Sequence, residues 1–271
     1  MDWWQALLLG IVQGLTEFLP VSSSGHLVIV RDLLGADPEG FLDFTVAVHF
    51  ATVLSTLVVF WKVILELLRG LFKFRYNDET DYVCKIVVSM IPVAVVGVLF
   101  RDRIAGLFGG EDVGVVPWFL LLTAALLMLS DFLSGRICRE NTHRNGISYL
   151  QALIVGVAQA FAVFPGLSRS GTTIATGLMS GVKREKMAQF SFLMVLVPII
   201  GEQSLDLLKS LGDGAPAGAG AGAAAIVVGA VAAFVSGLFA CKVMIALVRK
   251  ARLSWFALYC LVVAVLLFIF A

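Results

Sequence analysis

Two segments of this chain, offset by 146 residues, carry the same polar pattern inside otherwise apolar sequence. Residues 10–26 read GIVQGLTEFLPVSSSGH, and residues 156–172 read GVAQAFAVFPGLSRSGT. Without any gap, a glutamine, a phenylalanine, two serines and two glycines recur at matching positions. Polar groups at bilayer depth cost free energy, so they are rarely there by accident. A matched pair of hydrophobic segments interrupted by Gly or Pro points to a binding site at the interface between two structural repeats.

The composition places these segments in a membrane protein. The chain is 59% hydrophobic and 14% charged, whereas soluble domains contain roughly 25% charged residues. Long apolar runs are typical of membrane helices, in which every backbone polar group is satisfied internally. We therefore expect an all-α integral membrane protein. The formal net charge is +1, which argues against an acidic polymer such as nucleic acid as a partner.

A helix that crosses a bilayer needs about 20 predominantly apolar residues. Six segments fit a single crossing: 42–65, 84–100, 114–133, 188–208, 217–245 and 253–271. Two other apolar pieces, 3–19 and 149–164, are each followed by a polar tip and then by a short apolar stretch. We interpret each of these as two half-helices joined in a re-entrant hairpin. Non-helical backbone at that depth is tolerated only where it is buried in protein or lines a wet cavity.

On this interpretation the chain is a single membrane domain, residues 1–271, that divides into two repeats, 1–145 and 146–271. Each repeat holds one hairpin and three full crossings. Because three is odd, the second repeat enters the membrane from the opposite side, which predicts an inverted-topology repeat. The tips of the two hairpins then meet within the bilayer.

The distribution of Lys and Arg predicts the orientation. Segments 62–85, 134–148, 183–187 and 242–252 contain 15 of the 20 Lys and Arg residues. The positive-inside rule assigns these segments to the cytoplasm and both chain termini to the outside. The first hairpin then enters from the outer face and the second from the cytoplasm.

The two polar tips carry groups suited to a phosphorylated ligand. Gln13 and Glu17 are four residues apart, so they share one face of the first half-helix. His26 follows them, and Arg169 lies in the opposing tip. Hydroxyls and glycines accompany these groups at Ser22, Ser23, Ser24, Gly25, Ser168, Ser170 and Gly171. Arginine offers a planar fork of donors, and backbone N–H groups at half-helix starts favour anions. The tips therefore predict a phosphate site.

The same residues also have purely structural interpretations. An ion pair of Glu17 and Arg169 would hold the hairpins together, the serines would cap the half-helices, and His26 would be a hydrogen-bonded core residue. His49 lies in an apolar span, where we expect it to pack or to support the site. His143 lies in a basic loop, where we expect it to be solvated. The four cysteines lack metal-site spacing, and we interpret them as small buried hydrophobic residues.

Phosphoryl transfer requires neutralisation of the phosphate oxygens, a nucleophile, a proton acceptor and an exit for the leaving group. Arg169 and the tip amides meet the first requirement. Ser23 and His26 are both candidate nucleophiles, the latter through a phosphohistidine. Glu17 is a candidate to orient or deprotonate the nucleophile, or to hold a divalent metal. Because Glu17 is a single carboxylate, such an ion needs substrate phosphates and water as further ligands.

Both tips resemble the signature segments of one protein family. QGLTEFLPVSSSGH and PGLSRSGTT are similar to the two signatures of the bacterial undecaprenyl-diphosphate phosphatases, also known as bacitracin-resistance proteins. The similarity extends through nearly the whole chain, including FSFLMVLVPII at 190–200 and the span containing VAVHFATVL. The resemblance implies a hydrolase that removes the terminal phosphate of a C55 polyprenyl diphosphate. The product would be the monophosphate carrier used for peptidoglycan and other envelope polymers.

The resemblance also implies roles for individual residues. The glutamate-rich motif of the family falls on Gln13 and Glu17, and Gln13 replaces a glutamate of many members, which removes one candidate metal ligand. The catalytic serine and histidine fall on Ser23 and His26, and the essential arginine on Arg169. Phosphate contacts of the second tip fall on Ser168, Ser170 and Thr173. The resemblance further implies a divalent cation, magnesium or calcium. It also implies an interlocked inverted-repeat fold in the bacterial inner membrane, with a site open to the outer face. A homodimer is one expected assembly.

Two other functions fit parts of the pattern. Inverted repeats with broken helices also occur in transporters, so a lipid-phosphate transporter or flippase with the same site is the principal alternative. A transporter needs no nucleophile, so tolerance of changes at Ser23 and His26 would favour it. SSSGH also resembles part of the acid-phosphatase-like lipid phosphatases, but the other motifs of that superfamily are missing from this sequence.

Overall fold

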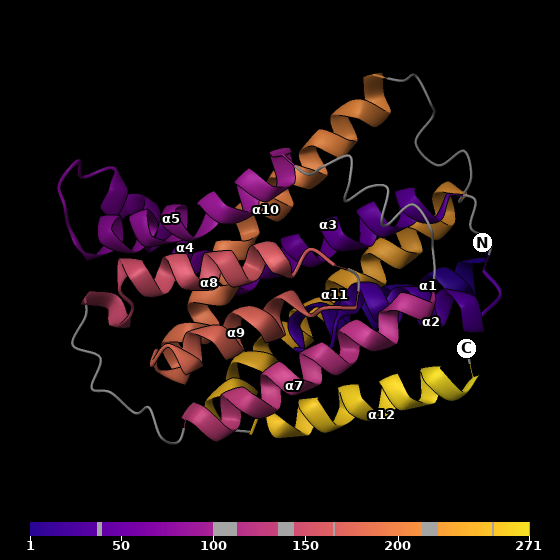
Figure 1. The fold of residues 1–271 in the computed structure, drawn as a ribbon. Helices are drawn as coiled ribbons and strands as arrows, with labels where there is room; N and C mark the ends of the chain where they lie inside the picture. The colour runs from indigo at the N-terminus through magenta and orange to yellow at the C-terminus, as the bar shows by residue number, and fades with distance from the viewer. Residues whose placement is uncertain are drawn as a thin grey trace.

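The computed structural model describes residues 1–36, 40–99, 113–134, 144–164, 166–212, 222–250 and 252–270. Within these ranges all regular structure is helical, as the sequence predicts (Figure 1). The α-helices are α1 (Trp3–Phe18), α2 (Ser23–Leu33), α3 (Phe41–Val59), α4 (Trp61–Leu71), α5 (Asp78–Leu99), α7 (Val116–Ser134), α8 (Tyr149–Phe161), α9 (Arg169–Met179), α10 (Arg184–Gly212), α11 (Ala223–Lys250) and α12 (Ser254–Phe270). Short 3₁₀ helices, η1 (Val113–Val115) and η2 (Arg144–Gly146), precede α7 and α8. The expectations for Cys138 and His143 concern residues outside the described ranges.

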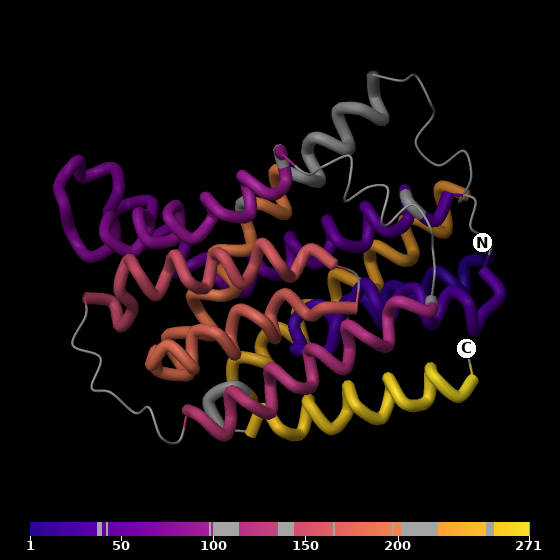
Figure 2. The backbone as a smooth tube through the Cα atoms, in the orientation of Figure 1, coloured from indigo at the N-terminus to yellow at the C-terminus, as the bar shows by residue number. Residues whose placement is uncertain are grey.

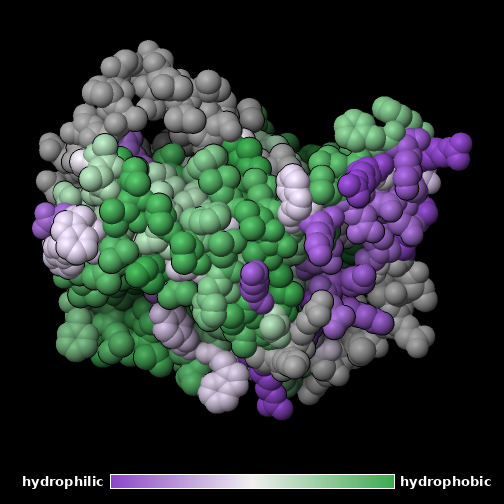
Figure 3. All heavy atoms as spheres, turned by 180° about the vertical axis from the view of Figure 1, so that it is seen from behind, coloured by the Kyte–Doolittle hydropathy of each residue, from purple (hydrophilic) through white to green (hydrophobic). Residues whose placement is uncertain are grey.

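Several helices are long and apolar enough to cross a membrane. By length and composition, α5, α7 and α11 meet this condition over Asp78–Gly97, Val116–Ser134 and Ala223–Leu247. The pair α3–α4 makes a fourth when it is counted as one bent span, and α12 is apolar but shorter, with 17 residues. Apolar side chains cover much of the face in Figure 3, and hydrophilic ones gather towards one end. The chain is therefore a helical, multi-pass membrane protein.

One expected span differs from the structure. Residues 42–65 do not form a single straight helix, because α3 ends at Val59 and the chain turns by 72° at Phe60 into α4. Lys62, Glu66 and Arg69 recur at intervals of four and three residues along α4, so they share one face. A helix with a charged face is more stable at the membrane surface than across the hydrocarbon core, which accounts for the bend.

Two helix pairs are interrupted where the sequence predicts polar tips. Residues 19–22 separate α1 from α2, and residues 162–168 separate α8 from α9. Ser22 has a φ of 68° and Gly166 a φ of 91°, values that the interior of a right-handed helix does not adopt. Each bound of α9 lies 146 residues after the corresponding bound of α2, which is also the offset between the two sequence patterns. The polar interruptions thus end one helix and begin the next.

Each interrupted pair has a glycine at which its first helix packs closely against a different long helix. Helix α1 packs against α11, and α8 packs against α5. A Cβ at Gly10 would lie 2.2 Å from the carbonyl oxygen of Gly229, and one at Gly156 would lie 2.1 Å from that of Ser89. Only glycine permits backbones to approach so closely, and small residues serve this purpose at many membrane helix interfaces. Gly10 and Gly156 occupy matching positions in the two sequence patterns.

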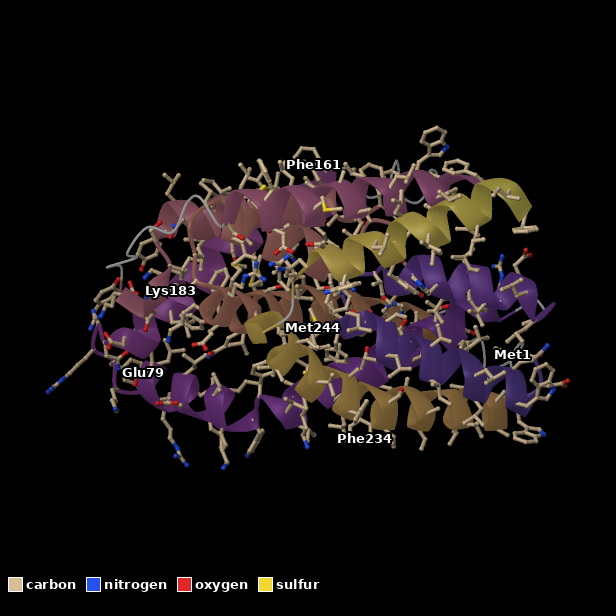
Figure 4. The ribbon with its side chains drawn as sticks, turned by 90° about the horizontal axis from the view of Figure 1, so that it is seen from below. Met1, Glu79, Phe161, Lys183, Phe234 and Met244 are labelled. Carbon is tan, nitrogen blue, oxygen red and sulfur yellow. The ribbon has the colours of Figure 1, made fainter. Side chains whose placement is uncertain are left out.

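The chain termini lie at the opposite end of the molecule from several basic segments. Figure 1 shows the two termini close together at one end and the connection between α4 and α5 at the other. The tube in Figure 2 runs through the starts of α8 and α10 near that second end. Figure 4 shows Lys183 and Glu79 at the end opposite Met1. The described parts of these Lys- and Arg-rich segments therefore lie on the same side of the molecule.

Candidate active site

The tips of the two interrupted helix pairs contact each other. A Cβ at Gly25 would lie 3.4 Å from the Cα of Gly166, and a Cβ at Gly171 would lie 3.3 Å from the Cβ of Pro20. The Ser170 hydroxyl donates a hydrogen bond to a backbone carbonyl of the first tip at 3.2 Å. Residues far apart in the sequence thus form one polar region between α1–α2 and α8–α9.

Each half-helix that follows a tip begins with a serine cap. Ser22 precedes α2, and its hydroxyl accepts a hydrogen bond from the Gly25 N–H at 3.4 Å. Ser168 precedes α9, and its hydroxyl accepts one from the Gly171 N–H at 3.0 Å. The capping interpretation is therefore correct for these two serines. The serine two positions later lies 3.4 Å from the capping hydroxyl in the first tip and 3.3 Å in the second.

Glu17 is the centre of the polar contacts between the tips. Its Oε2 accepts a hydrogen bond from the Ser23 hydroxyl at 2.6 Å and another from the Gln13 amide at 3.0 Å. Its Oε1 accepts one from Arg169 Nη2 of the opposing tip at 3.2 Å. His49 on α3 also approaches, with Nε2 3.8 Å from Oε2. The carboxylate is 12% exposed, and these partners compensate its charge in the protein interior.

A cavity of about 330 Å³ opens beside this carboxylate. Seven of the predicted site residues line it, namely Glu17, Ser22, Ser23, Ser24, Ser168, Arg169 and Ser170. Further lining comes from hydroxyl side chains of α3, such as Thr45 and Thr52, and from apolar side chains of α10, such as Phe192 and Val195. The cavity therefore combines a hydroxyl-rich wall, which carries the Glu17–Arg169 ion pair, with an apolar wall, and this combination suits an amphiphilic phosphate ester.

His26 is not among the residues that line this cavity. Its Nδ1 lies 2.7 Å from the Ser22 carbonyl oxygen, and its Nε2 lies 2.8 Å from the Tyr259 hydroxyl on α12. The His26 and Tyr259 rings stack with centroids 5.6 Å apart, and His26 is 7% exposed. Both ring nitrogens are engaged outside the cavity. This geometry agrees with the structural interpretation of His26 and places it poorly for attack on a phosphate in the cavity.

Four other predicted residues lie behind the cavity wall. Gln13 and Thr173 are fully buried. The Thr173 hydroxyl donates to the Arg169 carbonyl oxygen at 2.8 Å and lies 2.6 Å from a serine hydroxyl of α10. At Gly25 and Gly171 a Cβ would meet neighbouring atoms at 3.1 Å, so these glycines allow the tips to pack closely. None of the four lines the cavity, and each positions residues that do.

The sequence prediction omits Gln159 of α8, which lines the cavity and is 2% exposed. Gln159 matches Gln13 under the 146-residue offset, and that match is the sequence signal that identifies it. His49 supports the site, as expected. Its Nδ1 lies 2.9 Å from the Thr45 carbonyl oxygen, which leaves Nε2 to face Glu17. The approach of α3 to α1 creates this contact, and no local sequence pattern reveals it.

The described residues contain no group of three His, Cys, Asp or Glu side chains arranged to hold a metal ion. Glu17 is the only carboxylate among the residues that line the cavity. Cys241 and Cys260 are buried free thiols, and Cys84 is a partly buried one, in keeping with the expectation of apolar packing. Glu17 is therefore the one described acidic side chain at the cavity from which a cation ligand could come.

Comparison with known proteins identifies relatives of this chain. The family model described as bacitracin resistance protein BacA matches residues 6–266. A protein of Bacteroides fragilis named undecaprenyl-diphosphatase is 52% identical over 265 residues, which cover 98% of this chain and 97% of the relative. Proteins with the same name from Parabacteroides distasonis (53% over 260 residues, 96% and 95% covered) and Christiangramia forsetii (47% over 273 residues, 100% and 99% covered) are also similar. The chain therefore belongs to the BacA family of bacitracin resistance proteins.

Proposed function

We propose that this protein hydrolyses undecaprenyl diphosphate to undecaprenyl phosphate and inorganic phosphate, a reaction that recycles the lipid carrier of peptidoglycan synthesis. Relatives at 47 to 53% identity carry the name of this activity. The observation that carries the proposal is the Ser23 hydroxyl held 2.6 Å from Glu17 Oε2, with Arg169 on the other oxygen of the same carboxylate. A carrier needs no hydroxyl held against a carboxylate, whereas a nucleophile does.

Arg169 and the starts of α2 and α9 bind the diphosphate in this proposal. Nη2 of Arg169 contacts Glu17, and the fork of a guanidinium has further N–H donors for phosphate oxygens. The first N–H groups of each half-helix have no partner within the helix, so they also favour an anion. The Ser24 hydroxyl adds a donor on one side of the cavity, and the Ser170 hydroxyl, which donates its proton to the Leu19 carbonyl oxygen, lines the other side. The headgroup is thus bound between the tips, and the apolar wall receives the first part of the lipid.

Ser23 and Glu17 carry the chemical steps. The Ser23 oxygen attacks the terminal phosphorus, and its proton passes to Glu17 Oε2. The bond from that phosphorus to the bridging oxygen breaks, and undecaprenyl phosphate leaves as a dianion. Water then attacks the phosphoserine phosphorus, and the Ser23 oxygen departs with the proton held by Glu17. Inorganic phosphate carries away both protons of the water, so the enzyme returns to its starting state.

A divalent cation, magnesium or calcium, belongs to this proposal. Glu17 would hold it from the protein side, with the diphosphate and water as further ligands. The Gln13 amide oxygen fits such an environment, because it is buried without a hydrogen-bond partner among the described residues while the amide nitrogen of Gln13 contacts Glu17. When bound, the cation neutralises charge on the phosphate oxygens.

The proposed architecture is an inverted repeat of residues 1–145 and 146–271, with about six crossings and two re-entrant hairpins. The common offset of α2 and α9, and the contact between the tips, support it. The basic segments at one end would face the cytoplasm of a bacterial plasma membrane, and we propose a site open to the outer face, as the family resemblance implies. A cysteine introduced at Glu79, which lies at that end, should resist impermeant thiol reagents added outside; ready labelling would contradict this orientation. The proposed partners are the lipid substrate and the bilayer, and nucleic acid is not among them. A homodimer is the assembly to test.

Phosphate release from undecaprenyl diphosphate in detergent tests the proposed activity. We expect turnover by the wild type, loss of turnover with a chelator, and a decrease of roughly a thousandfold for Ser23→Ala and for Arg169→Ala. Arg69→Ala removes an exposed arginine of α4 and should keep the wild-type rate. A folded wild type that binds the lipid but releases no phosphate would overturn the proposal and favour a transporter.

A further inference from the structure

A second cavity lies away from the active site, where α7 ends and α10 and α12 begin. Its volume is about 1040 Å³. The last turns of α7 form one wall, the turn between α9 and α10 forms another, and the first residues around the start of α12 form the third. It shares no lining residue with the active-site cavity. The proposed hydrolysis therefore makes no use of it.

The rim of this cavity is positively charged. Lys183, Arg184 and Arg252 line it, and Asp131 is the only carboxylate among the described residues of its lining. Both oxygens of Asp131 are engaged, because Oδ1 accepts from Arg184 Nη2 at 2.5 Å and Oδ2 accepts from the Ser254 N–H at 2.9 Å. Lys183 and Arg252 are exposed, and neither forms an ion pair within the part of the chain that the structure describes. Two positive charges thus face the cavity without a carboxylate, which favours an anionic ligand.

The other side of the cavity is apolar. Met128, Leu129 and Phe132 line it and are 51, 47 and 58% exposed. They lie on α7, which is long and apolar enough to cross a membrane, so this surface meets acyl chains in a bilayer. A water-soluble anion would occupy the charged rim and leave the apolar side chains uncovered. An amphiphile with an anionic headgroup matches both parts of the cavity.

We propose that this cavity binds an anionic glycerophospholipid of the surrounding leaflet, with its phosphate on Lys183 and Arg252 and an acyl chain along α7. Basic pockets between membrane helices commonly take acidic headgroups. Figure 4 shows Lys183 at the end of the molecule opposite Met1, where a headgroup rather than an acyl chain is expected. The bound lipid would hold together the end of α7 and the starts of α10 and α12. A ligand that binds the folded state in this way stabilises it.

Thermal unfolding in lipid nanodiscs tests the proposal. The wild type is compared in phosphatidylcholine with and without added phosphatidylglycerol, and the concentration dependence gives an apparent affinity. The variant Lys183→Gln/Arg252→Gln removes both unpaired charges from the cavity. The matched control, Lys62→Gln/Arg69→Gln, removes the same charge from the exposed face of α4. We expect phosphatidylglycerol to raise the unfolding temperature of the wild type and the control, and to bind the cavity variant roughly tenfold more weakly or worse.

The possible contrary outcomes are distinct. Equal weakening in the cavity variant and the control would mean attraction to general surface charge and would overturn the proposal. Stabilisation by inorganic phosphate in detergent that equals the phosphatidylglycerol effect and is lost in the cavity variant would mean that this cavity takes a free anion, and the lipid assignment would fail. Displacement of phosphatidylglycerol by undecaprenyl phosphate would assign the cavity to the lipid carrier instead. Ser23→Ala should leave the phosphatidylglycerol response unchanged, so failure here is distinguishable from failure of the proposed hydrolysis.

Discussion

Arg169 and Glu17, 152 residues apart in the sequence, form a hydrogen-bonded ion pair at 3.2 Å that joins the two helix tips. The pair is structural, because it links α9 to α1, and it also forms part of the cavity wall. The sequence leaves these two interpretations as alternatives, and the structure is consistent with both at once. A bound phosphate would compete with Glu17 for the guanidinium, so substrate binding and the freedom of Glu17 to accept a proton are coupled.

Replacement of Arg169 by lysine tests whether the positive charge of this side chain or the planar shape of its guanidinium group is needed for activity. Lysine keeps the positive charge but lacks the planar fork that contacts two oxygens at once. We expect Arg169→Lys to lower kcat/KM by roughly 10- to 100-fold, which is less than the loss for Arg169→Ala. Steady-state phosphate release measures the effect, and the unfolding temperature reports whether the tips still dock. A wild-type rate in the lysine variant would mean that charge alone is sufficient.

Ser23 and His26 should respond differently to substitution. Ser23→Ala removes the proposed nucleophile and should abolish turnover while leaving the fold intact. His26→Ala removes the contact with Tyr259, so its main effect should be a lower unfolding temperature. Tyr259→Phe deletes the same hydrogen bond from the other side and should lower the unfolding temperature in the same direction. If His26→Ala loses all turnover at an unchanged unfolding temperature while Tyr259→Phe stays active, His26 is the better nucleophile candidate.

Binding of the cation should depend on the diphosphate. Because Glu17 is the one carboxylate among the described residues that line the cavity, the protein side chains alone offer few ligands for magnesium. We expect magnesium to bind weakly to the protein alone and at least tenfold more tightly in the presence of a non-hydrolysable methylene diphosphonate. Isothermal titration calorimetry measures both affinities without turnover. Glu17→Gln should remove the enhancement, and tight magnesium binding without the diphosphonate would contradict this account.

The close contact of α8 with α5 should tolerate no side chain at Gly156. A methyl group there would lie 2.1 Å from the Ser89 carbonyl oxygen, and a backbone atom cannot rotate away. We expect Gly156→Ala to lower the free energy of unfolding by about 1–3 kcal/mol. Gly201→Ala on α10 is the control, since no described atom lies within 4 Å of its added Cβ. Denaturant titration should therefore show destabilisation at Gly156 only; equal stability of both variants would refute the packing argument.

Lys85 and Asp81 form a buried ion pair near the start of α5, and the effects of substituting them on stability should be strongly coupled. Lys85 Nζ donates to Asp81 Oδ2 at 2.6 Å, and the two side chains are 3% and 5% exposed. Asp81→Asn leaves the buried Lys85 charge without its counter-ion and should cost about 3–5 kcal/mol. Lys85→Met should cost less, because the Asp81 carboxylate keeps hydrogen bonds from Tyr76, Asn145 and Tyr149. The double variant should cost clearly less than the sum of the two. The control is Asp78→Asn, which removes an exposed ion pair with Arg144 and should lower the free energy of unfolding by less than about 1 kcal/mol. If the effects of the Lys85 and Asp81 substitutions simply add in the double variant, the two side chains are not coupled.

The repeated pattern predicts the broken helices because its cause is local. Proline, glycine and serine clustered within a few residues favour a break in an apolar helix, so the breaks near Pro20 and Gly166 are readable from the sequence, whereas the single Pro92 and Pro198 lie inside continuous helices. The bend at Phe60 is less visible, since apolar residues continue past it. Only the charged face of α4 signals the change, and hydropathy averaged over the segment conceals it.

The sequence by itself determined the helical membrane class, the two polar tips and most of the polar residues that line the cavity between them. It identified Glu17, Ser23 and Arg169 as residue types suited to phosphate chemistry, because the residue type fixes which charges and hydrogen-bonding groups a side chain can offer. Only the tertiary structure decided which of these groups face one another. The His26 side chain of α2 meets Tyr259 of α12, and the approach of α3 to α1 brings His49 to Glu17. Distances between helices depend on side-chain packing across the whole molecule, and no local pattern encodes them.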